Sequence, residues 1–205
     1  MIQTLIIDGD GVVIKRDKRF SDRLHERYGI LPEITAPFFK TVFQKCVVGK
    51  ADLRKELAGV YRDWGWKGTL EELLHFWFSK EGTHNEEMLV TIEKLRAHGI
   101  PTFLSTDNEK HRTDYILNEF GLGKHFDGVF SSAYIGFRKE QPDFWEHVKQ
   151  VGKCEGEHTL VWDDEQSNID TARKAGFNAE LFIGMEDFTQ KMGMYFSEIP
   201  AAIST

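Results

Sequence analysis

Residues 5–13, LIIDGDGVV, decide the fold. The first half of this stretch is a run of β-forming residues bounded by glycine, which predicts a buried strand. Asp8 falls where the strand ends, and open α/β sheets bind their ligands at the carboxyl ends of strands. Gly9 and Gly11 tolerate backbone geometries that other residues resist, and they let a ligand approach closely. The stretch predicts a reaction centre or, as the alternative, an Asp-Gly turn after an edge strand.

Asp8 and Asp10 are separated by one residue, so their side chains point the same way if the chain stays extended. Two neighbouring carboxylates repel each other unless a cation or a shared proton compensates. Mg²⁺ suits this place because it takes oxygen ligands and only a few of them from protein. The pair therefore favours a magnesium site, although Asp-x-Asp alone is a common pattern.

The overall composition is that of an ordinary folded protein. The chain has 205 residues, of which 40% are hydrophobic and 29% are charged, enough for a core domain plus a small accessory domain. A formal net charge of −7 gives no indication of the basic surface that binds nucleic acid, and it argues against docking on an anionic membrane. The two cysteines, the N-terminus and the absence of a long apolar run predict a cytoplasmic protein without a membrane span. Both a monomer and a homodimer fit the sequence.

Residues 15–81 show helical periodicity and no expected strand. The predicted helices cover 17–28, 33–48, 51–64 and a stretch from Thr69, where Thr69 and Glu72 form a capping box. Short connections between amphipathic helices indicate an antiparallel bundle of four helices. We interpret its many aromatic residues as core packing.

The rest of the chain alternates between strands and helices. Strands are predicted at 3–8, 102–105, 128–131, 159–163 and 179–183, with helices between them and a last short helix near 186–193. This alternation indicates a mainly parallel sheet covered on both faces, which is a Rossmann-like three-layer α/β/α core. We expect the core to comprise residues 1–14 and 82–205, with residues 15–81 as an inserted helical domain.

Three further groups of polar residues stand at or near strand ends. Ser105 and Thr106 precede a helix, where a hydroxyl and backbone N–H groups could bind an anion or simply cap the helix. Asp163 and Asp164 end the strand 159–163, and the spacing suggests that Asp163 stands at the same height in the sheet as Asp8. Lys139 lies in a basic pair ahead of a helix, and its alternative is a solvated surface lysine.

In their order along the chain, these groups resemble the motifs of the haloacid dehalogenase (HAD) superfamily of phosphohydrolases. The first motif is matched by residues 8–12, DGDGV, the second by Ser105 and the third by Lys139. The fourth is matched by residues 163–164 together with Asn168. The resemblance covers nearly the whole chain, and residues 15–81 look like the C1-type helical cap of the family.

Two positions depart from the family pattern. The residue after the second-motif hydroxyl is often Asn and here is Thr106, which alters a contact beside the phosphate. The frequent Lys-Pro-x-Pro is KEQP in residues 139–142, so Glu140 stands beside the lysine and could weaken its effective charge. Neither change removes a group that the chemistry requires.

The resemblance implies separate roles for the two carboxylates of the first motif. Asp8 would be the nucleophile that forms an aspartyl-phosphate, and Asp10 would protonate the leaving oxygen and then deprotonate water. Mg²⁺ would be held by Asp8, the backbone carbonyl of Asp10 and Asp163, with Asp164 as a water-mediated partner. The phosphate would be bound by Gly9, Ser105, Thr106 and Lys139.

The expected activity is a Mg²⁺-dependent phosphatase acting on small phosphorylated metabolites, sugar phosphates among them. Lys50, in a loop between cap helices, is the candidate for a substrate contact, with an exposed helix-start lysine as its alternative. His111 and Arg112 are interpreted as helix-surface residues.

Other functions remain open. A haloacid dehalogenase shares the fold but needs no acid at Asp10, because a halide leaves without a proton. A phosphonatase would use a cap lysine, Lys45 or Lys50. A non-catalytic receiver-like or ligand-binding module is the remaining alternative, and the long helical insertion argues against a receiver.

Overall fold

Strand β1 (Thr4–Asp8) is the centre of the fold. The computed structural model describes residues 1–79, 82–152 and 154–197. Five strands form a sheet in the order β5-β4-β1-β6-β7, and every neighbouring pair is parallel. The other strands are β4 (Thr102–Thr106), β5 (Gly128–Ser131), β6 (Thr159–Asp163) and β7 (Asn178–Leu181). The interior of β1 is fully buried, as expected for a parallel strand covered on both faces.

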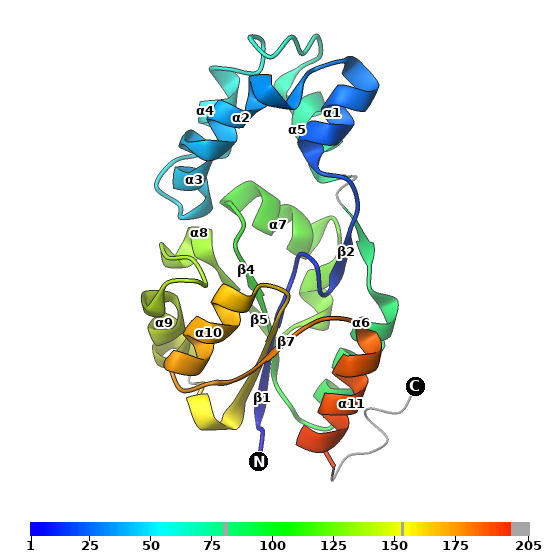
Figure 1. The fold of residues 1–205 in the computed structure, drawn as a ribbon, viewed down its shortest axis with the longest axis vertical. Helices are drawn as coiled ribbons and strands as arrows, with labels where there is room; N and C mark the ends of the chain where they lie inside the picture. Colours follow the sequence, from blue (N-terminus) through cyan, green and yellow to red (C-terminus); the bar gives the residue numbers. More distant parts are fainter. Residues whose placement is uncertain (80–81, 153, 198–205) are drawn as a thin grey trace.

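Helices cover the two faces of the sheet. One face packs against α6 (Glu86–Ala97), α7 (Lys110–Asn118) and α11 (Met185–Tyr195). The other face packs against α9 (Pro142–Gly152) and α10 (Gln166–Lys174) (Figure 1). Shorter elements connect them: η1 (Leu122–His125), α8 (Ser132–Ile135) and η2 (Gly156–His158). The predicted three-layer α/β/α architecture is confirmed.

The helical insertion stands over the carboxyl ends of the strands (Figure 1). It contains α1 (Phe20–Tyr28), α2 (Pro32–Lys40), α3 (Val42–Val47), α4 (Leu53–Ala58) and α5 (Leu70–Phe78). We call α1–α5 the insertion below. Its buried residues form a hydrophobic cluster of their own, rich in aromatic rings.

The prediction of four helices in the insertion was wrong, because the expected helix 33–48 divides into α2 and α3 at Thr41. The Thr41 hydroxyl donates to the carbonyl oxygen of Pro37 at 2.7 Å, and the Thr41 backbone leaves the helical region (φ −125°, ψ −83°). A side-chain bond to the carbonyl four residues back competes with the backbone ladder and bends helices. The expected helix 51–64 is also shorter, because α4 gives way to turns at Gly59.

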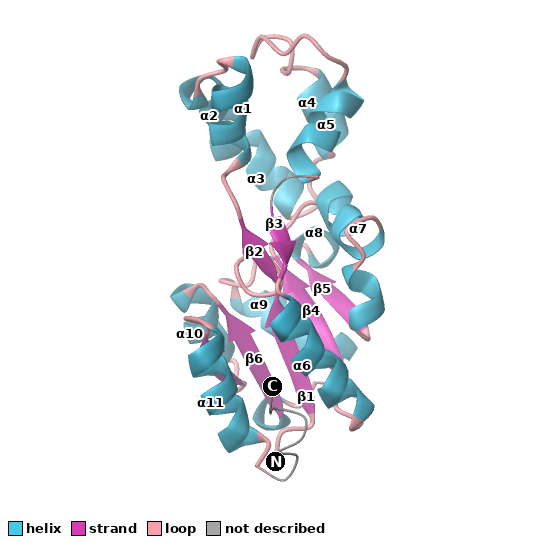
Figure 2. Cartoon of the chain, turned by 90° about the vertical axis from the view of Figure 1, so that its right-hand side faces the viewer, coloured by secondary structure: helices cyan, strands magenta, loops and turns pink. Residues whose placement is uncertain are grey.

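A two-stranded antiparallel ribbon connects the sheet to the insertion (Figure 2). It consists of β2 (Ile14–Arg16) and β3 (Gly82–His84), with Arg16 opposite Gly82 in the register. The expectation of no strand from residue 15 to 81 was wrong, since three-residue strands are too short to show an alternating pattern. The domain limits at 14/15 and 81/82 stay a prediction: β2 runs across the first, and residues 80–81 lie outside the described residues. Within the described residues, no helix is long and apolar enough to cross a membrane.

Asp52 joins the insertion to the core. Its Oδ1 accepts a hydrogen bond from the Lys55 backbone N–H at 3.0 Å and so caps α4, and its Oδ2 lies 3.0 Å from Nε2 of His111 on α7. The cap bond is the main reason that the pKa of Asp52 lies below its usual value, and His111 lowers it further.

We expect Asp52→Ala to lower the free energy of unfolding at pH 7 by about 1 kcal/mol, through loss of the helix cap. A depressed carboxyl pKa stabilises the fold above the unfolded pKa, near 4, and the contribution is lost as pH falls through the lower folded pKa. Urea unfolding at pH 7 and pH 3 should therefore show the difference from wild type shrinking in acid. Asp52→Asn, which still caps a helix, should lose less; an acid-independent difference would contradict this account.

Candidate active site

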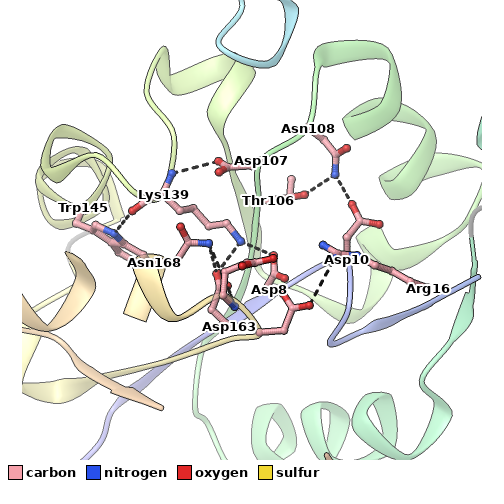
Figure 3. A network of polar contacts seen from close by, with 12 residues as sticks. Asp8, Asp10, Arg16, Thr106, Asp107, Asn108, Lys139, Trp145, Asp163 and Asn168 are labelled. Atoms are coloured by element: carbon pink, nitrogen blue, oxygen red, sulfur yellow. Dashed lines mark hydrogen bonds and ion pairs between the residues drawn. The ribbon is translucent and has the colours of Figure 1, made fainter. Parts of the chain in front are cut away.

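Asp8, Lys139 and Asp163 form the buried centre of the site. Ile7 of β1 lies opposite Trp162 of β6 in the register of the sheet. Asp8 and Asp163 are the next residues, so they end the two strands at the same height, as predicted. Nζ of Lys139 donates to Oδ1 of Asp8 at 2.5 Å and to Oδ2 of Asp163 at 2.7 Å (Figure 3). All three side chains are at most 4% exposed, so Lys139 is not a surface lysine.

The charged groups in this centre shift one another's pKa values. Burial raises the pKa of Asp8 well above its usual value, and Lys139 opposes that rise while Asp163 adds to it. Burial alone would lower the pKa of Lys139, but the charges of Asp8, Asp163 and Asp107 raise it above its usual value. Lys139 is therefore a permanent cation in this centre, and an ionised Asp8 depends on positive charge nearby.

Asp163 is saturated with hydrogen bonds. Its Oδ1 accepts from the Glu165 backbone N–H at 2.9 Å and from Asn168 at 3.0 Å, and its Oδ2 accepts from Lys139 and from Asn168 at 3.1 Å. Asn168 is the residue that the resemblance associates with the fourth motif. These contacts fix Asp163 beside Lys139 and leave it few lone pairs for another ligand.

The carboxylate of Asp164 has fewer contacts than that of Asp163. Its Oδ1 is buried and has no hydrogen-bond partner among the described residues, while its Oδ2 lies 3.5 Å from Nη1 of Arg16. Oxygen atoms of Asp8, Asp163 and Asp164 lie within 4.8 Å of one another. A buried, unpartnered carboxylate oxygen in an acidic cluster suits a hard cation, so the residues fit Mg²⁺.

Gly11 makes this arrangement possible. Its φ of +101° lies in a region that glycine favours, and a Cβ atom there would stand 2.0 Å from Oδ2 of Asp164. At Gly9, by contrast, a Cβ would lie 3.5 Å from Oγ1 of Thr106, an ordinary contact. The close approach that the sequence suggested is thus required at Gly11, while phosphate binding by Gly9 stays a prediction.

Asp10 stands apart from the buried centre and is held from α7 and the loop before it. Nδ2 of Asn108 donates to Oδ2 of Asp10 at 2.7 Å and to Oγ1 of Thr106 at 2.6 Å (Figure 3). Nη2 of Arg112 lies 3.6 Å from Oδ1 of Asp10. With a side chain 24% exposed, Asp10 faces the cavity rather than the core.

Ser105 lies opposite Asp8 in the register of β4 and β1, which places both side chains on the same side of the sheet. The Ser105 hydroxyl is buried and has no hydrogen-bond partner among the described residues. Such a hydroxyl is expensive to leave unpaired, and a ligand oxygen would satisfy it. Thr106, the next residue, lines the cavity itself.

A polar cavity of about 290 Å³ lies at this site, and Ser105 and Asp163 are not among its lining residues. Asp8, Asp10, Thr106, Lys139 and Asp164 all line it. Lys50 does not: it lines a separate cavity of about 210 Å³ beside Asp52 and His111, with no lining residue in common. We call the 290 Å³ cavity the phosphate cavity below.

Several contacts were not found from the sequence. Arg112, interpreted as a helix-surface residue, is only 4% exposed, and its Nη1 donates to the Phe78 carbonyl oxygen at 3.0 Å. That interpretation was wrong because the insertion covers the outward side of α7. Asp107 accepts a bond from the Lys139 backbone N–H at 3.1 Å, and Asn108 orients Asp10. No spacing signal marks these residues, since their partners come from distant parts of the chain.

A Rossmann-like parallel core with an acidic cluster and a buried lysine at the carboxyl edge of its sheet defines a protein with a carboxylate-based site at its strand ends. The chain belongs to the haloacid dehalogenase-like hydrolase family, whose model matches residues 2–176. The resemblance drawn from the sequence motifs is confirmed.

Curated relatives match part of the chain. The GMP/IMP nucleotidase YrfG of Escherichia coli (strain K12) is 30% identical over 91 residues, 44% of this chain and 41% of that protein. The sesquiterpene phosphatase astK of Aspergillus oryzae is 31% identical over 93 residues, 43% of this chain and 45% of that protein. The chain therefore spans less than half the length of these relatives.

Solved structures share the fold over most of the chain. An HAD family enzyme, BT-2542 from Bacteroides thetaiotaomicron, superimposes with a TM-score of 0.81 at 18% identity, covering 93% of this chain and 98% of that chain. The L-2-haloacid dehalogenase from Xanthobacter autotrophicus has a TM-score of 0.64 at 17% identity, covering 98% and 86%. Identities this low establish the fold alone.

Proposed function

We propose that the protein is a Mg²⁺-dependent phosphatase that hydrolyses phosphomonoesters through an aspartyl-phosphate. The observation that carries this proposal is the position of Asp10, which Asn108 holds at the wall of the same cavity that Asp8 lines. A carboxyl group there can give a proton to an alkoxide, and a halide would have no use for it. The names of two relatives, a nucleotidase and a phosphatase, agree with this choice.

The chemistry follows from the contacts of each side chain. An oxygen of Asp8 attacks phosphorus, the ester P–O bond breaks, and Asp10 transfers its proton to the departing alcohol oxygen. Asp10 then accepts a proton from water as the water attacks the aspartyl-phosphate and inorganic phosphate leaves. Lys139 and the unpaired hydroxyl of Ser105 donate hydrogen bonds to phosphoryl oxygens.

Mg²⁺ would be held by Asp8, Asp164 and the backbone carbonyl of Asp10. This reverses the expected order of the fourth-motif acids, because Asp163 is already occupied by Lys139, Asn168 and a backbone N–H. When bound, the ion supplies positive charge that offsets the repulsion between Asp8 and the phosphoryl oxygens. Asp163 acts by holding Lys139 in place.

We also propose that the insertion is a cap over the site, within residues 15–81. It stands above the strand ends, and the Arg112 side chain contacts both Asp10 and the last turn of α5. A helical cap excludes water from the reacting groups.

The direct test of this function is hydrolysis of p-nitrophenyl phosphate with Mg²⁺ and with EDTA. We expect turnover that EDTA abolishes and Mg²⁺ restores. No Mg²⁺-dependent turnover would overturn the proposal. Release of chloride from 2-chloropropionate would instead identify a dehalogenase.

Measurements of metal binding can distinguish the roles of Asp163 and Asp164, the two acids of the fourth motif. Mg²⁺ in large excess over its dissociation constant should raise the melting temperature of the wild type by several degrees, since a ligand at 100 times its Kd adds about 2.7 kcal/mol. Asp164→Asn should fold normally and lose this increment. Asp163→Asn should instead lower the melting temperature without metal, because Lys139 and Asn168 lose an acceptor. The reverse pattern would show that Asp163 is the direct ligand.

A further inference from the structure

A second cavity, of about 470 Å³, lies between the insertion and the core. Asp10 and Arg16 line both this cavity and the phosphate cavity, so the two meet at these residues. A phosphomonoester with its phosphoryl group beside Asp8 would extend past Asp10 into the second cavity. The ester oxygen would then lie where an acid is needed.

The wall of the second cavity is predominantly apolar. Phe20 and Trp77 stack with ring centroids 4.5 Å apart and planes 14° apart, and Phe39 packs edge-on to Trp77 at 5.3 Å. Pro32 and Ala36 complete this side. The rings hold one another in place, which gives a preformed apolar surface rather than a flexible one.

Part of the hydrogen-bonding capacity of the lining is already engaged within the protein. The Thr35 side chain is buried, and its hydroxyl donates to the Pro32 carbonyl oxygen at 3.1 Å. Lys18 forms an ion pair with Glu26 at 2.6 Å. A leaving group with many hydroxyls would lose water at the rings of Phe20, Phe39 and Trp77, which cannot replace its hydrogen bonds.

Cations form part of the lining of the second cavity. Arg16, Lys18, Arg19 and Lys40 line it, against two carboxylates, Asp10 and Asp17. The whole chain has a formal net charge of −7, which would repel a phosphate dianion. The local cations offset this repulsion along the approach to Asp8.

We infer that the preferred substrates are phosphomonoesters whose alcohol carries an apolar body, rather than sugar phosphates. This inference rests on the proposed phosphatase function and names its substrate class. The apolar body would pack against Phe20, Phe39 and Trp77, and a cavity of this volume is within the usual range for a small-molecule site. Lys50, on the separate 210 Å³ cavity, has no part in this recognition.

The test compares phosphate esters of primary alcohols, whose leaving groups have similar basicity: 2-phenylethyl phosphate, glucose 6-phosphate and methyl phosphate. We expect kcat/KM for 2-phenylethyl phosphate to exceed that for glucose 6-phosphate at least about tenfold, in line with the burial of an apolar group. If methyl phosphate is hydrolysed but glucose 6-phosphate equals or exceeds 2-phenylethyl phosphate, the substrate inference is overturned and the phosphatase function stands. If none of the three is hydrolysed with Mg²⁺, the proposed function itself fails.

A variant that fills the second cavity tests whether the apolar body of the substrate binds there. Ala36 lies on the cavity wall and is half-buried, so Ala36→Phe should occupy the cavity. The ratio of kcat/KM for 2-phenylethyl phosphate to that for methyl phosphate should fall about tenfold. The matched control is Ala58→Phe at the exposed end of α4, outside both cavities, where the ratio should not change. An unchanged ratio in a folded Ala36→Phe protein would place the apolar body elsewhere; the wild-type comparison decides the substrate class if this variant does not fold.

Discussion

Replacing Asp8 with Asn is expected to lower kcat for p-nitrophenyl phosphate at least about a thousandfold, as loss of a covalent nucleophile does elsewhere. An amide cannot attack phosphorus, and the variant also removes one carboxylate from the proposed metal site. The fold should survive, because Lys139 keeps its bond to Asp163. Steady-state assays with Mg²⁺, together with a thermal unfolding curve, check both parts. Activity that persists in Asp8→Asn would show that Asp8 is not the nucleophile.

Asp10→Asn distinguishes the two carboxylates of the first motif. The p-nitrophenolate group leaves without help from an acid, so the first step should continue while hydrolysis of the aspartyl-phosphate slows. Rapid mixing should then show a burst of p-nitrophenolate and slow turnover. The absence of a burst, with turnover as fast as in the wild type, would remove Asp10 from the proposed mechanism.

Replacing Lys139 with Met is expected to lower the free energy of unfolding at pH 7 by about 3 kcal/mol or more. The change leaves Asp8 and Asp163 buried without the cation that lies between them, and breaking a buried ion pair from one side is strongly destabilising. Urea unfolding measures the loss. Lys149→Met is the matched control, since Lys149 pairs with Glu146 on the surface and should change stability by less than about 1 kcal/mol.

The loss in Lys139→Met should depend on pH in a defined direction. Burial already raises the pKa of Asp8, and without Lys139 that pKa should rise further. A carboxyl group with a raised folded pKa destabilises the fold as pH rises through that pKa, so the deficit should shrink when the solution is made acidic. A deficit of the same size at pH 5 and pH 7, or one no larger than in Lys149→Met, would contradict the buried-charge account.

The sequence is a good guide to the strands and to the residues at their ends, because each strand is marked by one continuous apolar run. The buried strands β1 and β6 are continuous runs of β-forming residues, and each ends in an Asp at the carboxyl edge of the sheet, where ligands bind in such folds. The order of strands and helices then brings Asp8, Ser105 and Asp163 to one edge of the sheet. This much follows from local pattern and parallel topology.

The sequence is a poor guide to features that depend on contacts between side chains from distant parts of the chain. Asp163 and Asp164 are adjacent and chemically equal, and only their partners, Lys139 for one and Arg16 for the other, distinguish them. Arg112 has the spacing of a helix-surface residue, and its burial depends on an insertion contributed by another part of the chain. The break between α2 and α3 depends on one hydroxyl that a periodicity argument does not weigh.

The ribbon of β2 and β3 also has a consequence for how the chain can change. On either side of the insertion the chain passes through residues that lie opposite each other in one antiparallel pair, Arg16 and Gly82, and such residues lie only about 5 Å apart. A tight two-residue turn, or a foreign helical unit with equally close ends, can bridge the same gap without disturbing the sheet. We therefore expect the strand ends that carry the acids and the helices of the insertion to be separately exchangeable, which would make grafting of the insertion a route to redesigned specificity.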